Sequence, residues 1–296
     1  MKIKQLLSIG EGMLNGAGIE SAKHDAGALL CFATGFDRHQ ILLDRDSDVD
    51  ERQSELYLGL VRRRGGGEPL QYITGEQYFM GHRFAVNPSV LIPRPETEML
   101  AEKAIAYIKA RIGAGQAIRV LDLCTGSGVL AISIAKACPS VKVTASDISE
   151  QALLTAKKNA LELGVQERVE FIKSDLFEAI GLGSTALPGR GAIKNKYGLI
   201  VTNPPYIRTG DLAGLQREIK DHEPLEALDG GADGLEYYRR IATDAQAHLD
   251  EKGMLMAEIG CDQAQAAACI FKIAGFAVIE IFQDLAGHDR ILTACP

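Results

Sequence analysis

The residues best suited to chemistry form an Asn-Pro-Pro-Tyr segment that follows the apolar residues 198–201: Asn203, Pro204, Pro205 and Tyr206. The Asn203 side-chain oxygen and the Pro204 carbonyl can each accept one N–H of a planar amide or amine. The prolines have no N–H to donate and they stiffen the loop, so both acceptors are preset. Tyr206 offers a flat face to a planar group. The plain alternative is a turn that ends a strand, which Asn-Pro pairs also favour.

A second candidate site is the glycine-rich segment at residues 122–128, Asp-Leu-Cys-Thr-Gly-Ser-Gly. Glycines allow a tight turn and let the backbone approach a ligand closely. Asp147 ends the second expected strand, 19 residues beyond Gly128, where its carboxylate can accept both hydroxyls of a ribose. Together these features predict a cofactor that contains adenosine. The loop by itself fits NAD and S-adenosylmethionine alike, and Asp147 by itself could be an exposed carboxylate at a strand end.

The Asn-Pro-Pro-Tyr loop distinguishes between these cofactors. An NAD enzyme has no use for two fixed acceptors around a planar nitrogen, whereas methyl transfer needs that lone pair aimed at an electrophilic methyl group. The sequence therefore favours S-adenosylmethionine.

The elements that position these segments alternate between strand and helix from residue 118 onward. Expected strands are 118–123, 141–147, 169–173, 197–203, 254–259, 278–282 and 291–294, and expected helices are 129–137, 150–163, 235–249 and 264–274. This alternation predicts an α/β fold with a doubly wound, mostly parallel, seven-stranded sheet and helices on both faces. The short connection between the last two strands predicts an antiparallel pair. The first and fourth strands should adjoin at the switch point, where ligands bind.

The sequence predicts two domains and a linker. Residues 1–75 carry apolar side chains at helical spacing and predict a small helical bundle. We expect this domain to recognise the substrate, although its spacing pattern does not show this. Residues 76–93 predict a β-hairpin linker, and residues 94–296 the methyltransferase domain, with Pro95 opening a helix. The three arginines at 62–64 are expected at a solvated helix end, and contact with RNA near a bound partner is the alternative. The Gly-, Ser- and Pro-rich residues 181–196 are expected to form a flexible surface loop.

The composition excludes several classes of protein. A net charge of −7 without a basic run makes phosphate-backbone binding improbable, so we expect no nucleic-acid partner. No apolar run has the length of a membrane span, so no membrane association is expected. The 6 cysteines form no C-x-x-C pair and no cluster with zinc-ligand spacing, which predicts free thiols, no metal site and a cytoplasmic location.

Residues 122–128, Asp147 and residues 203–206 resemble those of class I methyltransferases that modify planar nitrogens. More specifically, the chain resembles the HemK/PrmC family of peptide chain release factor glutamine N5-methyltransferases nearly from end to end. The resemblance includes the helical N-terminal region and residues 69–75, 93–98, 228–235, 258–260 and 284–290. It implies methylation of the glutamine in the Gly-Gly-Gln loop of class 1 release factors, with S-adenosylmethionine as cofactor. We expect a monomer.

The resemblance also implies roles for single residues. Asp147 would hold the ribose, Leu176 would lie near the adenine, and Asn203 would touch both cofactor and glutamine. The methionine part would be wrapped by Cys124, Thr125, Gly126, Ser127 and Gly128, and the glutamine amide bound by Asn203, Pro204, Pro205 and Tyr206. Two positions depart from the family pattern. Cys124 stands where many relatives have glycine, which is tolerable if its φ is not positive, and Leu176 lacks the aromatic face that many relatives have.

Three other functions fit the same motifs. One is glutamine methylation of a ribosomal protein. Another is methylation of an adenine or cytosine amino group in a nucleic acid, which would call for a basic channel and a target-recognition domain. The last is a binding module that keeps the fold without catalysis, which intact Asp147 and Asn203 argue against.

Overall fold

The structure is a computed structural model that describes residues 1–181 and 196–296. The predicted surface loop at 181–196 lies, apart from its two end residues, outside the described residues. The chain divides into two compact units. The first comprises Met1–Glu76 and Gln216–His222, and the second Gln77–Leu215 and Glu223–Pro296. Residues 94–296 were predicted to form one continuous domain, whereas Gln216–His222 belong to the first unit. No local pattern in those residues indicates this.

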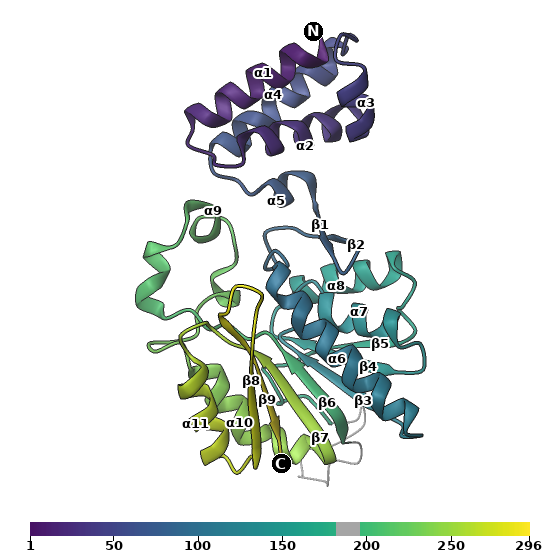
Figure 1. Cartoon of the computed structure of the whole chain (residues 1–296), viewed down its shortest axis with the longest axis vertical. Helices are drawn as coiled ribbons and strands as arrows, with labels where there is room; N and C mark the ends of the chain where they lie inside the picture. The colour runs from purple at the N-terminus through teal and green to yellow at the C-terminus, as the bar shows by residue number, and fades with distance from the viewer. Residues whose placement is uncertain (182–195) are drawn as a thin grey trace. The chain divides into compact units, whose positions relative to one another are not determined.

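The N-terminal helices of the first unit form a small bundle (Figure 1). The unit's helices are α1 (Ile3–Gly16), α2 (Ala22–Thr34), α3 (Arg38–Leu43), α4 (Glu51–Gly65), α5 (Leu70–Thr74) and, from the later segment, α9 (Arg217–Lys220). In α1, α2 and α4 the buried apolar residues recur at helical spacing, as the sequence predicted, and they include Leu6, Leu29 and Tyr57. Asp50 accepts a hydrogen bond from the Gln53 N–H and so caps the start of α4.

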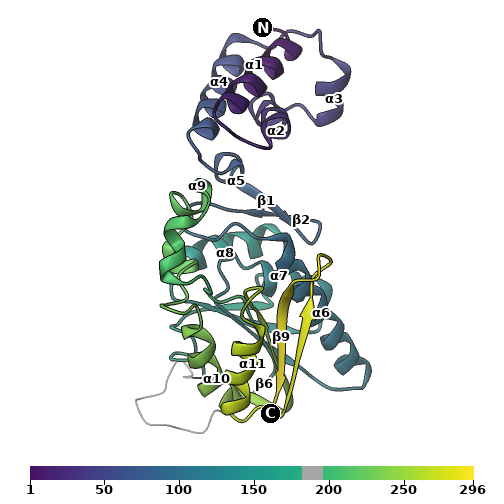
Figure 2. The ribbon, with the colours of Figure 1, turned by 60° about the vertical axis from the view of Figure 1, so that its left-hand side comes forward.

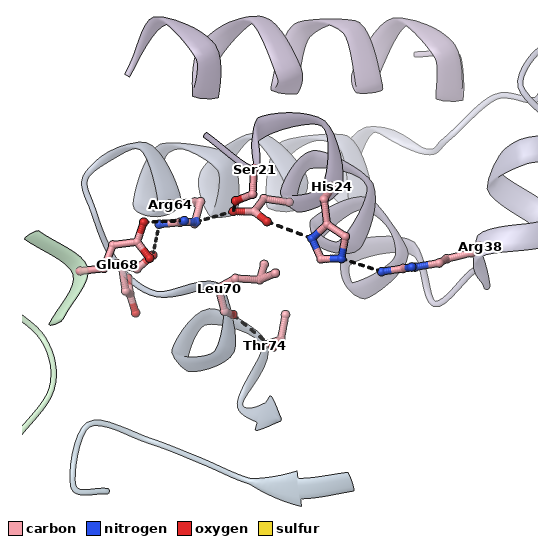
Figure 3. A network of polar contacts seen from close by, with 9 residues as sticks. Ser21, His24, Arg38, Arg64, Glu68, Leu70 and Thr74 are labelled. Carbon is pink, nitrogen blue, oxygen red and sulfur yellow. Dashed lines mark hydrogen bonds and ion pairs between the residues drawn. The ribbon is translucent and has the colours of Figure 1, made fainter. Parts of the chain in front are cut away.

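The last turn of α4 corrects the prediction of a solvated helix end for Arg64, whereas Arg62 and Arg63 are exposed as predicted. The Arg64 side chain is only 4% exposed, and it donates to Asp25 Oδ2 and to Glu218 Oε1, each at 2.7 Å. Ser21 Oγ also donates to Asp25 Oδ2 at 2.8 Å, and His24 Nδ1 lies 3.0 Å from Asp25 Oδ1. Figure 3 shows Ser21, His24 and Arg64 in this network. A buried guanidinium needs opposite charges around it, and residues far away along the chain supply them. The sequence could not reveal this pairing.

A hairpin of β1 (Glu76–Phe79) and β2 (His82–Ala85) follows α5, and from Gln77 onward it belongs to the second unit. Met80 and Gly81 form its turn, with φ values of 50° and 73°. Positive φ at both central residues matches the twist of a two-residue hairpin.

A seven-stranded sheet forms the centre of the second unit, with strand order β5-β4-β3-β6-β7-β9-β8. Its strands are β3 (Arg119–Leu123), β4 (Lys142–Asp147), β5 (Val169–Lys173), β6 (Tyr197–Thr202), β7 (Leu249–Glu258), β8 (Val278–Gln283) and β9 (Asp289–Cys295). All neighbouring pairs are parallel except those that β9 makes with β7 and β8. The predicted fold class is confirmed, including the antiparallel final pair and the adjacency of the first and fourth strands.

Helices cover both faces of this sheet (Figures 1 and 2). One face packs against α6 (Pro95–Gly113), α7 (Val129–Ala137) and α8 (Glu150–Glu162), and the other against α10 (Glu236–His248) and α11 (Ala264–Ile273). Successive strand residues alternate between the two cores: Val120 and Val201 lie in the first, Leu121 and Ile200 in the second. The excursion from β6 to α10 carries two 3₁₀ turns, Thr209–Gly214 and Leu225–Ala227. No helix within the described ranges is both long and apolar enough to cross a bilayer.

Candidate active site

The glycine-rich segment connects the end of β3 to α7. Gly128 has a φ of 84°, and a Cβ there would lie 2.8 Å from Ile132 Cδ1 and 3.1 Å from Ala156 Cβ, so a side chain would not fit. Gly126 also has a positive φ, of 54°, but a Cβ there would meet nothing within 4 Å. Gly126 borders a cavity at the carboxyl ends of the strands. The backbone is therefore bare on the side where a ligand can approach.

Cys124 does not avoid a positive φ. Its φ is 58°, so the condition under which a non-glycine residue was expected to be tolerated here is not met. The left-handed region is strained for a residue with a Cβ. The tight exit from β3 imposes this conformation, since Thr125 N–H donates to the Ser146 carbonyl of the neighbouring strand at 2.9 Å. Burial also raises the pKa of the Cys124 thiol, which favours an inert neutral group.

Two carboxylates hold this loop in place. Asp122 is fully buried and accepts from Thr125 Oγ1 at 2.6 Å and from Ala131 N–H at 3.1 Å, which ties the loop to α7. Burial raises its pKa to about 7, against the effect of these two hydrogen bonds. Asp147 accepts from Gly126 N–H at 2.8 Å with one oxygen and from Ser149 N–H at 2.9 Å with the other. Burial raises the pKa of Asp147 as well, again opposed by its backbone donors.

Ile148 and Leu176 contribute apolar surface to the lining of the cavity. Leu176 adopts a φ of 47° in a short turn, where its carbonyl accepts from Ser174 Oγ at 2.8 Å. Ile148 directly follows Asp147, borders the cavity and is 54% exposed. Its role could not be predicted from its type, but its place after a strand-end carboxylate was a usable signal.

The Asn203 loop begins where β6 ends beside β3. Thr202 Oγ1 donates to the Leu123 carbonyl at 3.0 Å and joins the two strand ends. Asn203 Nδ2 donates to Thr97 Oγ1 at 3.3 Å, and Thr97 Oγ1 in turn donates to Glu258 Oε2 at 2.7 Å. Because the amide nitrogen is occupied in this way, Asn203 Oδ1 is left as the group that can accept from a ligand.

The rest of this loop is fixed through its backbone. The Tyr206 carbonyl accepts from Gln263 Nε2 at 2.8 Å. Gly230 packs so closely that a Cβ there would lie 2.7 Å from Tyr206 Cα and 2.9 Å from the Pro205 carbonyl oxygen. Burial raises the pKa of the Tyr206 hydroxyl above its usual range, so it stays neutral. The loop is thus held in one conformation, as a preset pair of acceptors requires.

The cavity brings most of the residues selected from the sequence together. It is bordered by Cys124, Thr125, Gly126, Ser127, Asp147, Leu176, Asn203 and Pro205. Gly128, Pro204 and Tyr206 adjoin these residues in the chain without bordering the cavity. Further lining residues that the sequence analysis gave no role include Arg94, Thr97, Asp175, Glu226 and Tyr237. Arg94 and Thr97 lie in residues 93–98, which were noted only as part of a family pattern.

The cavity satisfies the chemical needs of S-adenosylmethionine. Each Asp147 oxygen keeps a lone pair after its backbone bond, so the pair can accept the two hydroxyls of a ribose. Ile148 and Leu176 offer apolar contact to a purine, and the open side of Gly126 admits a close ligand. Among residues 1–181 and 196–296, no cluster of His, Cys, Asp and Glu could hold a metal ion.

The solved structures support the fold assignment. The hMettl16 catalytic domain, solved in complex with MAT2A 3′UTR hairpin 6, aligns with a TM-score of 0.54 at 14% identity and covers 83% of this chain and 82% of that one. At this identity the likeness concerns the fold alone. The model of the methyltransferase small domain matches residues 105–219. Fold and site together define a class I methyltransferase, the class that uses S-adenosylmethionine as its cofactor.

Sequence comparison identifies the family within that class. The model of the PrmC N-terminal domain matches residues 5–75. A release factor glutamine methyltransferase of Geobacter sulfurreducens is 38% identical, over 98% of this chain and 95% of that protein. A relative with the same name from Agrobacterium fabrum is 36% identical, over 95% of this chain and 92% of that protein. Another from Bordetella pertussis is 41% identical, over 84% of this chain and 86% of that protein. The chain belongs to the release factor glutamine methyltransferase family.

Proposed function

We propose that this protein methylates the side-chain amide nitrogen, N5, of the glutamine in the Gly-Gly-Gln loop of class 1 peptide chain release factors. The named activity of its relatives supports the substrate. The observation that carries the chemistry is the hydrogen bonding of Asn203, whose Nδ2 is occupied by Thr97 while Oδ1 remains available. An available acceptor beside a cofactor cavity suits an amide N–H, which is a donor.

Family resemblance and geometry support one assignment of roles to the cavity residues. Cys124, Thr125, Gly126, Ser127 and Gly128 wrap the methionine part of the cofactor. Asp147 holds the ribose, Leu176 contacts the adenine, and Asn203 touches both cofactor and glutamine. Pro204 contributes its carbonyl as second acceptor, and Pro205 and Tyr206 complete the glutamine site. Since Pro204 and Tyr206 do not border the cavity, the glutamine in this proposal extends beyond it, along the loop.

The protein's part in the reaction is mainly to position the nitrogen. An amide nitrogen is a poor nucleophile because its lone pair is delocalised into the carbonyl group. When bound, S-adenosylmethionine supplies an electrophilic methyl group on a positively charged sulfur. Asn203 Oδ1 and the Pro204 carbonyl accept the two amide N–H bonds and so direct the lone pair. These hydrogen bonds strengthen as positive charge develops on the nitrogen, so they stabilise the transition state more than the bound substrate. The proton then leaves to water or by way of these acceptors.

We further propose that residues 1–75 recognise the release factor, that the protein acts as a monomer in the cytoplasm, and that it binds no nucleic acid directly. The 6 cysteines are all free, which suits a reducing compartment. The net charge of −7 disfavours phosphate-backbone contacts.

Labelled S-adenosylmethionine tests the proposed reaction directly. We expect label to pass to a purified class 1 release factor, and not to the same factor with its Gly-Gly-Gln glutamine changed to alanine. Transfer to both factors would contradict the target residue. Transfer instead to a ribosomal protein, or to DNA or RNA, would retain fold and cofactor but overturn the substrate.

A further inference from the structure

Glu258 is a buried carboxylic acid to which the mechanism above assigns no role. It is the last residue of β7, and the pairing of Thr202 with Ala257 places it next to Asn203 at the edge of the sheet. Its side chain is only 2% exposed and does not border the cofactor cavity. Burial of a carboxylic acid is unfavourable unless its oxygens form hydrogen bonds. The side-chain partners of Glu258 are Thr97 and Asn203.

We propose that Glu258, acting through Thr97, is the positioning residue that keeps the Asn203 amide turned with its oxygen toward the substrate. The inference rests on the proposed function, because it concerns how Asn203 receives a glutamine amide. It adds a pair of residues, outside the Asn-Pro-Pro-Tyr loop, that control the direction of hydrogen bonding at the reacting nitrogen.

The direction follows from the number of protons in the network. An ionised Glu258 can only accept, so the Thr97 hydroxyl must donate to it across the 2.7 Å between Thr97 Oγ1 and Glu258 Oε2. The Thr97 oxygen is then free to accept from Asn203 Nδ2. In this series of hydrogen bonds, from Asn203 through Thr97 to Glu258, the donors point away from the substrate. The Asn203 Oδ1 acceptor therefore faces the substrate.

Protonation of Glu258 permits the opposite direction. A carboxylic acid can donate to Thr97 Oγ1, whose hydroxyl can then donate to Asn203 Oδ1. That arrangement favours the flipped amide, which presents Nδ2 to the substrate. Two N–H donors would then face each other, so the glutamine amide would lose its acceptor. Protonation of Glu258 would also remove its negative charge, which in the ionised form stabilises the positive charge that develops on the reacting nitrogen.

The surroundings of Glu258 place this switch in an accessible pH range. Burial raises its pKa to about 7, opposed by the hydroxyl of Thr97, the charge of Arg290 on β9 and the amide of Asn203, and assisted by Glu96 on α6. Tyr206 is the ionisable group of the adjacent loop, and the Tyr238 hydroxyl on α10 donates to the Glu258 carbonyl at 3.1 Å. Burial raises the pKa of both tyrosines, so neither titrates near neutrality. The maximal methylation rate should therefore rise with pH through about 7.

The test compares Glu258→Gln with the wild-type enzyme, using intact release factor and saturating S-adenosylmethionine. Glutamine has nearly the same shape but carries both donors and an acceptor, so it fixes no direction. We expect kcat to fall about tenfold and the rise in kcat through neutral pH to disappear. The KM for release factor and the calorimetric affinity for S-adenosylmethionine should change little, which also reports that the variant is folded. A variant with the wild-type kcat and the wild-type pH profile would overturn the inference.

A matched pair at Thr97 tests the relay if Glu258→Gln does not fold. Thr97→Val keeps the shape of the side chain and removes the hydroxyl, so kcat should fall about tenfold. Thr97→Ser keeps the hydroxyl and should recover most of the rate. Equal rates for the two variants would contradict the relay. If wild-type enzyme does not methylate release factor at all, the proposed function fails and this inference with it. Normal wild-type transfer with unaffected variants defeats the inference alone.

Discussion

At the scale of single residues, Asn203 carries the chemical argument. Its amide nitrogen is bound to Thr97 and its oxygen is available for a donor. Asn203→Ala removes this acceptor, and we expect kcat to fall by about 100-fold or more, as when one preorganised hydrogen-bond partner of a transition state is lost. Steady-state methylation of release factor measures this. Normal turnover with unchanged affinities would show that the assigned role is wrong.

Cys124 leads to a prediction about stability. Its φ of 58° is strained for any residue with a Cβ. The free energy of unfolding of the Cys124→Gly variant should therefore be about 1 kcal/mol larger than that of the Cys124→Ala variant. The alanine variant is the control, because it also lacks the thiol but keeps the strain. Urea denaturation of both proteins without cofactor provides the comparison. If the alanine variant is as stable as the glycine variant, the loop relaxes without strain.

At the scale of elements, the Asn203 loop is held by the segment that leads into α10. Gly230 N–H donates to the Ile207 carbonyl at 2.7 Å, and Ile207 N–H donates to the Leu228 carbonyl at 3.0 Å. A Cβ on Gly230 would press on backbone atoms of Pro205 and Tyr206, which cannot rotate away. Gly230→Ala should therefore shift the acceptors and lower kcat at least about tenfold, since a displacement of about 1 Å can cost 100-fold.

Gly214→Ala is the matched control for this prediction. Gly214 lies in the same excursion between β6 and α10, and a Cβ there would meet nothing within 4 Å. We expect it to leave kcat close to the wild-type value. Both variants should retain their affinity for S-adenosylmethionine, since neither glycine borders the cavity. A Gly230→Ala enzyme with normal kcat would mean that the loop tolerates displacement.

At the scale of the whole molecule, the buried acids couple folding to pH. Burial raises the Asp122 pKa from 3.8 to about 7, so the folded protein holds a proton that the unfolded chain releases. This contribution to stability is fully present below the unfolded pKa and is lost as pH rises through the folded pKa. Asp122→Asn has no such titration. Its free energy of unfolding relative to wild type should therefore increase between about pH 5 and about pH 8, by a few kcal/mol.

Chemical denaturation without cofactor, at both pH values, measures that change. Carboxylates whose pKa values are lowered, such as Asp233, change stability with pH in the direction opposite to Asp122. They contribute equally in the variant and in wild type, so their effect cancels when the two proteins are compared at the same pH. A difference in stability that is the same at both pH values would show that Asp122 does not carry the raised pKa.

The sequence by itself determined the architecture of the second unit. Apolar runs such as residues 198–201 are local, and each becomes a strand because both of its faces must be buried. Their alternation with helical segments leaves few topologies, and the short final connection leaves only an antiparallel pair. The glycine segment and residues 203–206 then had to meet, since β3 and β6 adjoin in such a sheet.

Only the tertiary structure decided which distant residues pair. Glu258 and Thr97 lie on different elements from Asn203, and nothing in their local sequence indicates that they share a hydrogen-bond network. Arg64 looked like a surface arginine until Asp25 and Glu218 were found beside it. Local periodicity reports which side chains must leave water, because burial depends on each residue's own chemistry. The partner of a buried polar group depends instead on how the elements pack, so it is fixed only when the chain has folded.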